Sequence, residues 1–308
     1  MKETIKYYYD IDVDNLEEID GKYHFKFQNR DFFFIYYNRD IDELDDIILC
    51  INDMKQKGIL VNDIVLNRNQ QFLTKVDEYN YILMAVSNAS EEYDIFDIMN
   101  YNSKLQLNNK NSKLYRNNWK NLWIQKVDYL EYQIRELGLN KSVIKDSFSY
   151  YVGLAENAIS YVDNANFKYF TNSVNIVLSH RRIFYPNYKL NFMNPLSFIF
   201  DLEVRDIAEY LKSLFFSDDE FEDVAFEDLV YYLKLRRLSI YEYSMLYARL
   251  LYPSYYFDIY EEVMNKDRDE EDLVLIINKN QKYEEFLKKT YLEITKYAPI
   301  EKIDWLIS

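Results

Sequence analysis

The chain has 308 residues, a length that favours two domains or lobes and is ample for a sizeable core. Hydrophobic residues make up 49% of it and charged residues 29%, a balance typical of a soluble globular protein and not of a disordered one. The formal charge of −15 argues against nucleic acid or an anionic membrane as a partner, because contacts with phosphate need surplus Lys and Arg.

The first forty residues predict β-strands. Tyr and Phe are dense from Lys6 to Asn38, in alternating and continuous runs that favour β structure. Turns are expected at 20–21 and 29–31, where polar residues interrupt these runs. The chain has 32 tyrosines in all, which suit partly buried surfaces and interfaces, although an A/T-rich genome would enrich them too.

A helix and two more strands are predicted next. Acidic residues at 40–44 open the helix, and Gly58 ends it. The single cysteine, Cys50, lies in its apolar run, so we expect a buried free thiol and no intramolecular disulfide. The strands are predicted near 72–76 and 81–86. Strands, one helix and a closing hairpin are the plan of a kinase small lobe.

This predicted lobe lacks two parts with which kinases hold ATP. Kinases use a glycine-rich loop over the phosphates and a strand lysine that contacts the α- and β-phosphates. Here no glycine occurs between Gly21 and Gly58, and the strand before the helix, Asp31 to Asn38, contains no lysine. We therefore do not expect ATP or Mg²⁺ to bind tightly.

The remainder of the chain is predicted to be mostly helical. The polar stretch 86–92 is the best linker candidate, so we expect a strand-rich domain at 1–88 and a helical domain at 89–308. With four glycines and four prolines in the whole chain, long spans lack helix breakers. Helices are predicted at 114–137, 141–162, 203–216, 222–235, 239–251, 254–265 and 280–294.

A kinase-like motif lies between these helices. Phosphotransferases related to aminoglycoside and choline kinases carry the loop H-x-D-x-x-x-x-N, in which the Asp accepts the substrate hydroxyl proton and the Asn helps to hold a metal. In this chain His180, Arg182 and Asn187 stand at the H, D and N spacings. Because an arginine is permanently protonated, Arg182 cannot serve as that base.

A second loss is predicted just beyond this loop. The run from Asp201 to Ala208 resembles the segment that follows the metal-binding strand in the spore coat branch of these kinases. Counting back from Asp201 places Asn194 at the position of the metal aspartate, where a neutral carbonyl replaces the carboxylate that Mg²⁺ prefers. Asp206 is retained, and the resemblance implies that it anchors the following helix to the backbone of the catalytic loop.

Two longer motifs strengthen the resemblance. Residues 150–159 read YYVGLAENAI and residues 245–257 read MLYARLLYPSYYF, and both are similar to motifs of the YutH-type spore coat proteins of the CotS family. The similarity covers roughly Trp119 to Phe257. It implies an α+β, two-lobed protein-kinase-like fold of the aminoglycoside phosphotransferase type, with a small antiparallel β lobe and a larger, mostly helical lobe.

We therefore expect a catalytically inactive kinase-like protein, a pseudokinase, that acts as a structural or assembly component of the bacterial endospore coat. The resemblance implies other spore coat proteins as partners and leaves a homo-oligomer open. It also implies a location on the mother-cell, cytoplasmic side of the coat. This location agrees with the lack of a signal peptide and of any stretch near 18 apolar residues.

Two other functions stay open. A divergent small-molecule phosphotransferase could use Asp201 or Glu203 in place of the lost groups. A metal-dependent hydrolase is not expected, because two isolated histidines and one cysteine provide no ligand cluster for a metal.

The other open function is binding of an anionic ligand in the former ATP cleft. Arg181, Arg182 and Lys189 are the candidate residues for it. The competing expectation is that Arg182 pairs with an acid such as Asp201 or Asp206 and fills the vacated site.

Overall fold

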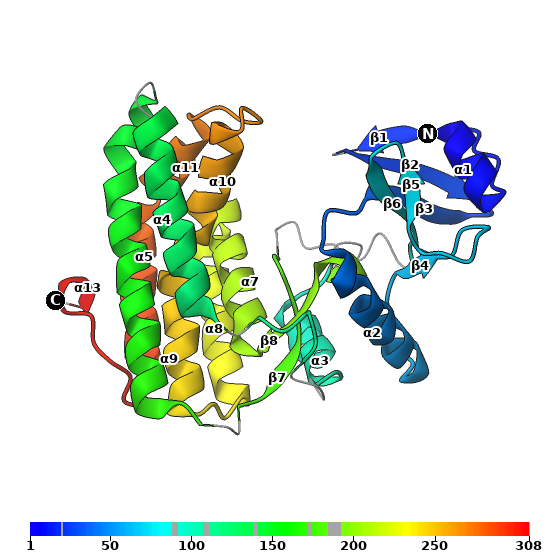
Figure 1. The fold of residues 1–308 in the computed structure, drawn as a ribbon. Coiled ribbons are helices and arrows are strands. Elements are labelled where there is room, and N and C mark those ends of the chain that lie inside the picture. Colours follow the sequence, from blue (N-terminus) through cyan, green and yellow to red (C-terminus); the bar gives the residue numbers. More distant parts are fainter. Residues whose placement is uncertain are drawn as a thin grey trace. The chain divides into compact units, whose positions relative to one another are not determined.

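The computed structural model describes residues 1–19, 21–87, 92–106, 111–116, 118–137, 141–171, 174–183 and 192–307 (Figure 1). The chain forms two compact units. The first, here called the strand unit, comprises residues 1–94, 107–115 and 186–199, and the second, the helical unit, comprises 95–106, 116–185 and 200–308. Each unit therefore draws on segments that are distant in sequence. Much of the predicted linker, at 88–91, lies outside the described residues.

The strand unit is built on an antiparallel sheet in the order β1-β2-β3-β6-β4, and β5 also pairs with β6. Gln28 and Asn29 form the turn between β2 and β3 with φ values of 48° and 61°. Two residues in this left-handed region match the twist of a tight hairpin. The strands are β1 Glu17–Ile19, β2 Lys22–Phe27, β3 Arg30–Tyr36, β4 Asp63–Val65, β5 Thr74–Val76 and β6 Tyr79–Ala85.

The first helix corrects one prediction. α1, Lys2–Tyr9, takes up the start of the aromatic run for which we predicted strands. Ile5 of α1 is fully buried in a core with Phe25 and Phe34 of the sheet, whereas Tyr7 is exposed. Aromatic side chains suit either structure, and the burial of Ile5 against the sheet favours the helix.

The helix predicted to end at Gly58 is present. A short 3₁₀ turn, η1 (Ile41–Glu43), leads into α2, Leu44–Gln56, and Gly58 follows with a φ of 68°. Cys50 is a buried free cysteine on the inner face of α2, as predicted. Burial raises the pKa of its thiol to about 12.

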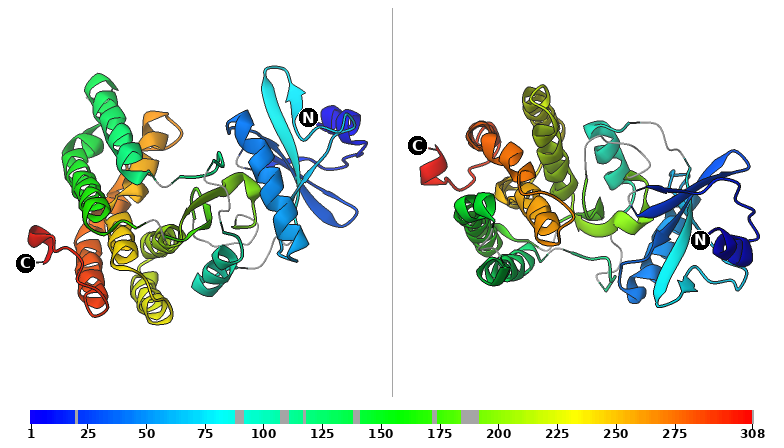
Figure 2. Two further views of the ribbon diagram at one scale, coloured as in Figure 1. Left: turned by 60° about the horizontal axis from the view of Figure 1, so that its bottom comes forward. Right: turned by 90° about the horizontal axis from the view of Figure 1, so that it is seen from above.

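The helical unit consists of long helices and the two-stranded sheet β7–β8. α5 packs against α4 and α9, and α7 packs against α8 and α9 (Figure 2). The elements are α3 Ile95–Ser103, α4 Trp119–Leu137, α5 Ser142–Tyr169, β7 Ile176–His180, β8 Phe198–Leu202, α7 Val204–Ser217, α8 Phe221–Leu235, α9 Ile240–Leu251, α10 Ser254–Met264, α11 Asp272–Asn278, α12 Asn280–Ile294 and α13 Asp304–Ile307. The first two residues of β8, like the 3₁₀ turn η3 (Pro195–Ser197), belong to the strand unit.

The predicted helices from residue 203 onwards agree with α7, α8, α9, α10 and α12 to within one residue at each end. α5 continues to Tyr169, beyond its predicted end at 162. α3 and α11 were not predicted. α11 begins at the end of the charge run 267–272. Such runs are typical of solvated loops, and the apolar stretch that follows is short, so the sequence did not indicate a helix here.

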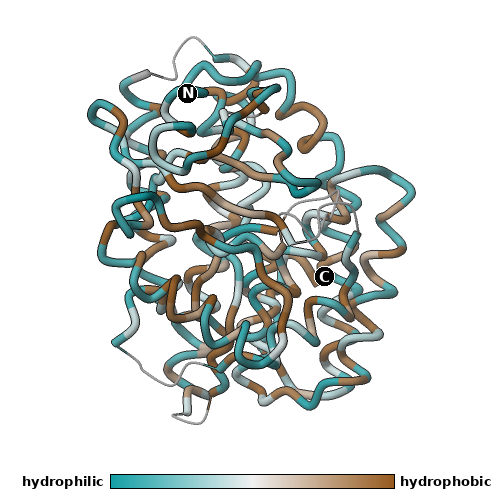
Figure 3. Tube along the Cα trace, turned by 90° about the vertical axis from the view of Figure 1, so that its right-hand side faces the viewer, coloured by the Kyte–Doolittle hydropathy of each residue, from teal (hydrophilic) through white to brown (hydrophobic). Residues whose placement is uncertain are grey.

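Tyrosines contribute much of the interior of the helical unit. Tyr151 and Tyr256 stack with ring centroids 3.6 Å apart, and their hydroxyls bond to Asn280 and Ser147. Hydrophobic and hydrophilic residues recur in short alternation along the helices (Figure 3). Among the described residues, no helix combines the length and apolar character needed to cross a membrane. The fully buried tyrosines of this unit include Tyr151, Tyr232, Tyr247, Tyr256, Tyr260 and Tyr283.

Candidate functional site

The loop motif begins where β7 ends. His180 is the last residue of this strand and is almost completely buried. Its backbone N–H donates to Oδ1 of Asp206 at 2.9 Å, and its Nδ1 lies 2.7 Å from Oδ2 of the same carboxylate. Asn102 donates a third hydrogen bond to Oδ2 at 3.2 Å. Asp206 lies in the first turn of α7, so these bonds join the start of that helix to the end of β7.

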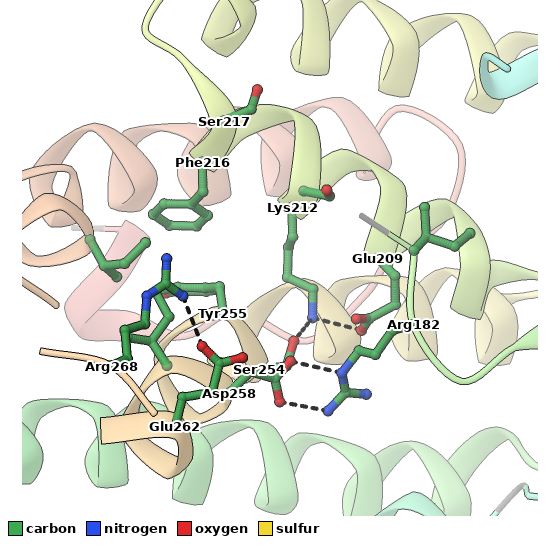
Figure 4. A pocket seen from close by; sticks show the side chains of 14 residues that line it. Arg182, Glu209, Lys212, Phe216, Ser217, Ser254, Tyr255, Asp258, Glu262 and Arg268 are labelled. Carbon is green, nitrogen blue, oxygen red and sulfur yellow. Dashed lines mark hydrogen bonds and ion pairs between the residues drawn. The ribbon is translucent and has the colours of Figure 1, made fainter. Parts of the chain in front are cut away.

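Arg182, two residues further on, is bound to an acid that we did not predict. Its Nε and Nη2 donate to the two carboxylate oxygens of Asp258 in α10 at 2.8 and 2.9 Å (Figure 4). Burial lowers the pKa of Arg182, but the Asp258 carboxylate outweighs it and raises this pKa above the usual range. The expected pairing of Arg182 with an acid is thus present, but its suggested partners, Asp201 and Asp206, are wrong, because both carboxylates are occupied elsewhere.

Asn194 does not lie on the strand that follows the loop. It belongs to the strand unit and caps the η3 turn, where its side-chain oxygen accepts from the backbone N–H of Leu196 at 3.0 Å. The described strand that follows, β8, carries Asp201 near its end. Strand position therefore favours Asp201, and not Asn194, as the counterpart of the metal aspartate.

Asp201 is sealed inside the helical unit. It has no exposed surface, and both of its carboxylate oxygens accept from Nε1 of Trp119, at 3.1 and 2.9 Å. Arg205 donates to Oδ2 and the backbone of Leu202 to Oδ1, each at 2.8 Å. Burial raises the pKa of Asp201, and Arg205 and Trp119 oppose this rise. A metal ion would have to displace these donors, so the residues present do not fit Mg²⁺.

A buried charge cluster that the sequence analysis missed surrounds Asp201 and Arg182. Oε1 of Glu209 accepts from Nζ of Lys212 at 2.9 Å and from Nε of Arg249 at 2.8 Å. Burial raises the pKa of Glu209, but the two cations outweigh it and hold this pKa well below the usual range. Burial lowers the pKa of Lys212 to about 8. Glu209 and Lys212 lie on buried turns of α7 between apolar residues, and this is the signal that could have revealed them.

Two pockets flank the Arg182–Asp258 pair. One has a volume of about 280 Å³ and lies between α7, α10 and α11, with Lys212, Tyr255 and Arg268 in its wall (Figure 4). The other, of about 190 Å³, is bordered by α4, α9 and α10. Both lie within the helical unit.

The remaining predicted residues do not join this cluster as a set. Arg181 is exposed, and its carbonyl accepts from Arg182 and Arg205. Glu203 pairs with Arg236 at 2.9 Å. Asn187 and Lys189 lie outside the described residues. Within the described ranges, no group of three or more His, Cys, Asp or Glu side chains is arranged to hold a metal ion.

The strand unit contains a further ion pair that sequence reasoning missed. Arg39, which follows β3, donates from Nε to Oε2 of Glu43 at 2.6 Å. Its Nη1 donates to the carbonyls of Leu196 and Phe198, each at 2.8 Å. A buried arginine therefore joins the start of α2 to the segment around η3 in the same unit.

The fold is that of the aminoglycoside phosphotransferase-like kinases, as predicted. The chain is similar to an aminoglycoside phosphotransferase from Alicyclobacillus acidocaldarius, with a TM-score of 0.66, 10% identity and 94% of each chain covered. It is also similar to a spectinomycin phosphotransferase in complex with ADP and spectinomycin, with a TM-score of 0.54, 12% identity and coverage of 100% of this chain and 96% of that one.

The family model for the spore coat putative kinase YutH matches residues 2–290, and the chain belongs to this family. It is 30% identical over 209 residues to the endospore coat-associated protein YutH of Bacillus subtilis. This match spans 61% of the present chain and 61% of the length of that relative. The resemblance to the YutH-type proteins is thus confirmed.

Proposed function

We propose that this chain is a kinase-like protein that does not transfer phosphoryl groups and that acts as a structural or assembly component of the endospore coat. The observation that carries the first part is the state of Arg182. Its spacing from His180 places it at the position of the catalytic base, and its guanidinium donates to both oxygens of Asp258. A group with no acceptor and a raised pKa cannot take a proton from a hydroxyl.

Three further features support this reading. The carboxylate of Asp201 is fully occupied by Trp119, Arg205 and a backbone N–H. The sequence from 17 to 30, which includes β2 and the connections on either side of it, contains a single glycine, Gly21, and so lacks the glycine-rich segment with which kinases surround phosphates. No lysine stands on β3. Mg·ATP would therefore lack both its metal ligand and its phosphate donors.

Thermal unfolding with and without millimolar Mg·ATP tests whether the chain lacks the nucleotide site that phosphoryl transfer requires. A site whose Kd lies tenfold below the ligand concentration would add about 1.4 kcal/mol of stability, a rise in melting temperature of about 2 °C or more. We expect no rise beyond that caused by Mg²⁺ with an equal concentration of tripolyphosphate. A rise that requires the adenosine moiety would reinstate a phosphotransferase.

Membership of the family and the coat association of the Bacillus subtilis relative support the coat assignment. In this proposal the protein lies on the mother-cell side, with other coat proteins as partners. A fluorescent fusion expressed in sporulating Bacillus subtilis should form a ring around the forespore and stay with the coat fraction. Uniform fluorescence in the mother cell at all stages would contradict this assignment and leave the absence of catalysis untouched.

A further inference from the structure

The smaller of the two pockets has a wall rich in cations. Lys126, Arg182, Arg205 and Arg249 line it, and Asp258 is the single carboxylate among the lining residues. The rings of Trp119, Trp123 and Tyr252 complete the wall. Trp123 and Tyr252 stack with centroids 4.2 Å apart, so the aromatic side of the pocket is rigidly packed.

The charges of the surrounding cluster do not balance. Its cations are Arg182, Arg205, Lys212 and Arg249, and its carboxylates are Asp201, Glu209 and Asp258. Four cations against three carboxylates leave one positive charge. Lys126 is neutralised by its own partner, Glu261. Asp206 is bonded to His180 and Asn102 and makes no ion pair with these four cations, so it is not part of this cluster.

Among the cations of this cluster, Arg249 is the one that lines the pocket with side-chain donors not used within the described part of the chain. Its side chain is 4% exposed, and its Nε donates to Glu209. Its two Nη groups donate no hydrogen bond to any described residue, and the residue lines the pocket. Its guanidinium carbon lies 4.9 and 5.6 Å from the ring centroids of Trp119 and Trp123. By contrast, each nitrogen of Arg205 has an acceptor.

Neither Nη atom of Arg249 is among the fully buried donors that lack a partner, so both are open to a ligand in the pocket. An oxyanion supplies both the acceptor and the missing negative charge, and a planar guanidinium binds carboxylate and phosphate groups through two parallel hydrogen bonds. We propose that this pocket binds a small oxyanion, the phosphate or carboxylate group of a metabolite, with Arg249 as its anchor.

This site differs from the anionic site expected from the sequence. It shares Arg182 with the expected site, but it is centred on Arg249 and includes neither Arg181 nor Lys189 among its lining residues. It goes beyond the proposed function, because anion binding requires neither phosphoryl transfer nor its absence. The two proposals therefore fail in different experiments.

Tryptophan fluorescence tests the site directly, because Trp119 and Trp123 lie in its wall. The full chain is titrated with sodium phosphate, and separately with sodium malonate, at an ionic strength held constant with sodium chloride. We expect a saturable change with one of the two probes at micromolar to millimolar concentration. The probe that binds more tightly identifies the oxyanion class. Absence of saturation with both probes would overturn the proposal.

A charge at the mouth of the pocket provides the sharper test. Leu122 lines the pocket and is 45% exposed, so Leu122→Glu adds a carboxylate there without removing a member of any ion pair. We expect a Kd at least tenfold higher in this variant, which corresponds to a loss of about 1.4 kcal/mol in binding free energy. Tyr132→Glu is the matched control, because Tyr132 lies on the same helix, is 65% exposed and does not line the pocket. Its Kd should equal that of the unaltered chain.

Arg249→Gln tests the anchor itself and should abolish saturation. Because it also removes a partner of Glu209, its fold is checked by circular dichroism before titration. If this variant does not fold, the Leu122→Glu and Tyr132→Glu pair decides the question alone. Equal Kd values in that pair, or an unchanged Kd in a folded Arg249→Gln variant, would refute the site.

Discussion

The two units bury charge in different ways. In the strand unit, Arg39 pairs with Glu43 and also donates to two backbone carbonyls. In the helical unit, one carboxylate, Glu209, serves both Lys212 and Arg249. Arg39 keeps its carbonyl acceptors if Glu43 is lost. If Glu209 is lost, two buried cations lose their carboxylate: Lys212 keeps the carbonyls of Arg249 and Tyr252 and the hydroxyl of Ser254, whereas Arg249 keeps no acceptor among the described residues. The helical unit should therefore be the more sensitive of the two to any change in charge.

The largest expected effect is the response to alkali, because the buried tyrosines concentrate in the helical unit. Burial raises the pKa of Tyr151, Tyr247 and Tyr283, and it raises that of Tyr256 to about 12. Above pH 10 the unfolded phenols lose protons that the folded ones keep, so stability is full below pH 10 and falls as pH rises. Each such tyrosine removes about 1.4 kcal/mol per pH unit until its folded pKa is reached.

Urea unfolding at a series of pH values from 9 upwards measures this loss. Tyr256→Phe should make the fall in unfolding free energy above pH 10 less steep by about 1.4 kcal/mol per pH unit, the contribution of one proton. Tyr132→Phe is the matched control, since solvent reaches that phenol in the folded and unfolded chain alike. A chain whose stability is constant from pH 10 to 12 would show that these phenols are not protected by the fold.

The next largest effect is expected for Glu209→Ala. This change leaves Lys212 and Arg249 buried without their shared carboxylate, so we expect a loss of about 4 kcal/mol in the free energy of unfolding. Urea unfolding measures it. Glu262→Ala is the control, because Glu262 pairs with Arg268 at the surface and should cost less than about 1 kcal/mol. A loss for Glu209→Ala no greater than the control would mean that the cluster is not a stabilising network.

A smaller effect is expected for Glu43→Ala in the strand unit. Arg39 keeps its bonds to the carbonyls of Leu196 and Phe198, so we expect a loss of about 2 kcal/mol. The same unfolding measurement applies, with Asp53→Ala, which breaks an exposed pair with Lys57 on α2, as the control. If Glu43→Ala costs as much as Glu209→Ala, the contrast between the units is wrong.

Local signals explain which parts of the fold could be predicted. Gly58 and the helix before it, and the helices after residue 203, depend on neighbours in sequence, and both were predicted well. α1 was missed because the burial of Ile5 depends on strands far along the chain. The segments 107–115 and 186–199 join the strand unit through contacts that no local pattern encodes.

The same distinction holds for the site. Asp206 could be identified because its motif is contiguous, and the structure places it against His180 as the resemblance implied, although its function as an anchor stays a proposal. The partner of Arg182 is 76 residues away, and Arg249 meets Glu209 across 40 residues. Charged residues within apolar helices signal buried pairs, but only the packing of α7, α9 and α10 determines which charges meet.

The bonds of Asp201 have a consequence for any attempt to introduce a catalytic carboxylate into this chain. Arg182→Asp would change one residue and would still leave Asp201 held by Trp119 and Arg205, on two different helices. It would also set a second carboxylate beside Asp258. Arg182→Asp alone would therefore leave Asp201 closed to a metal ion, and repulsion between the two neighbouring carboxylates would destabilise the variant. The contacts of Asp201 would therefore have to be broken together with the change at residue 182 before a metal ion could bind there.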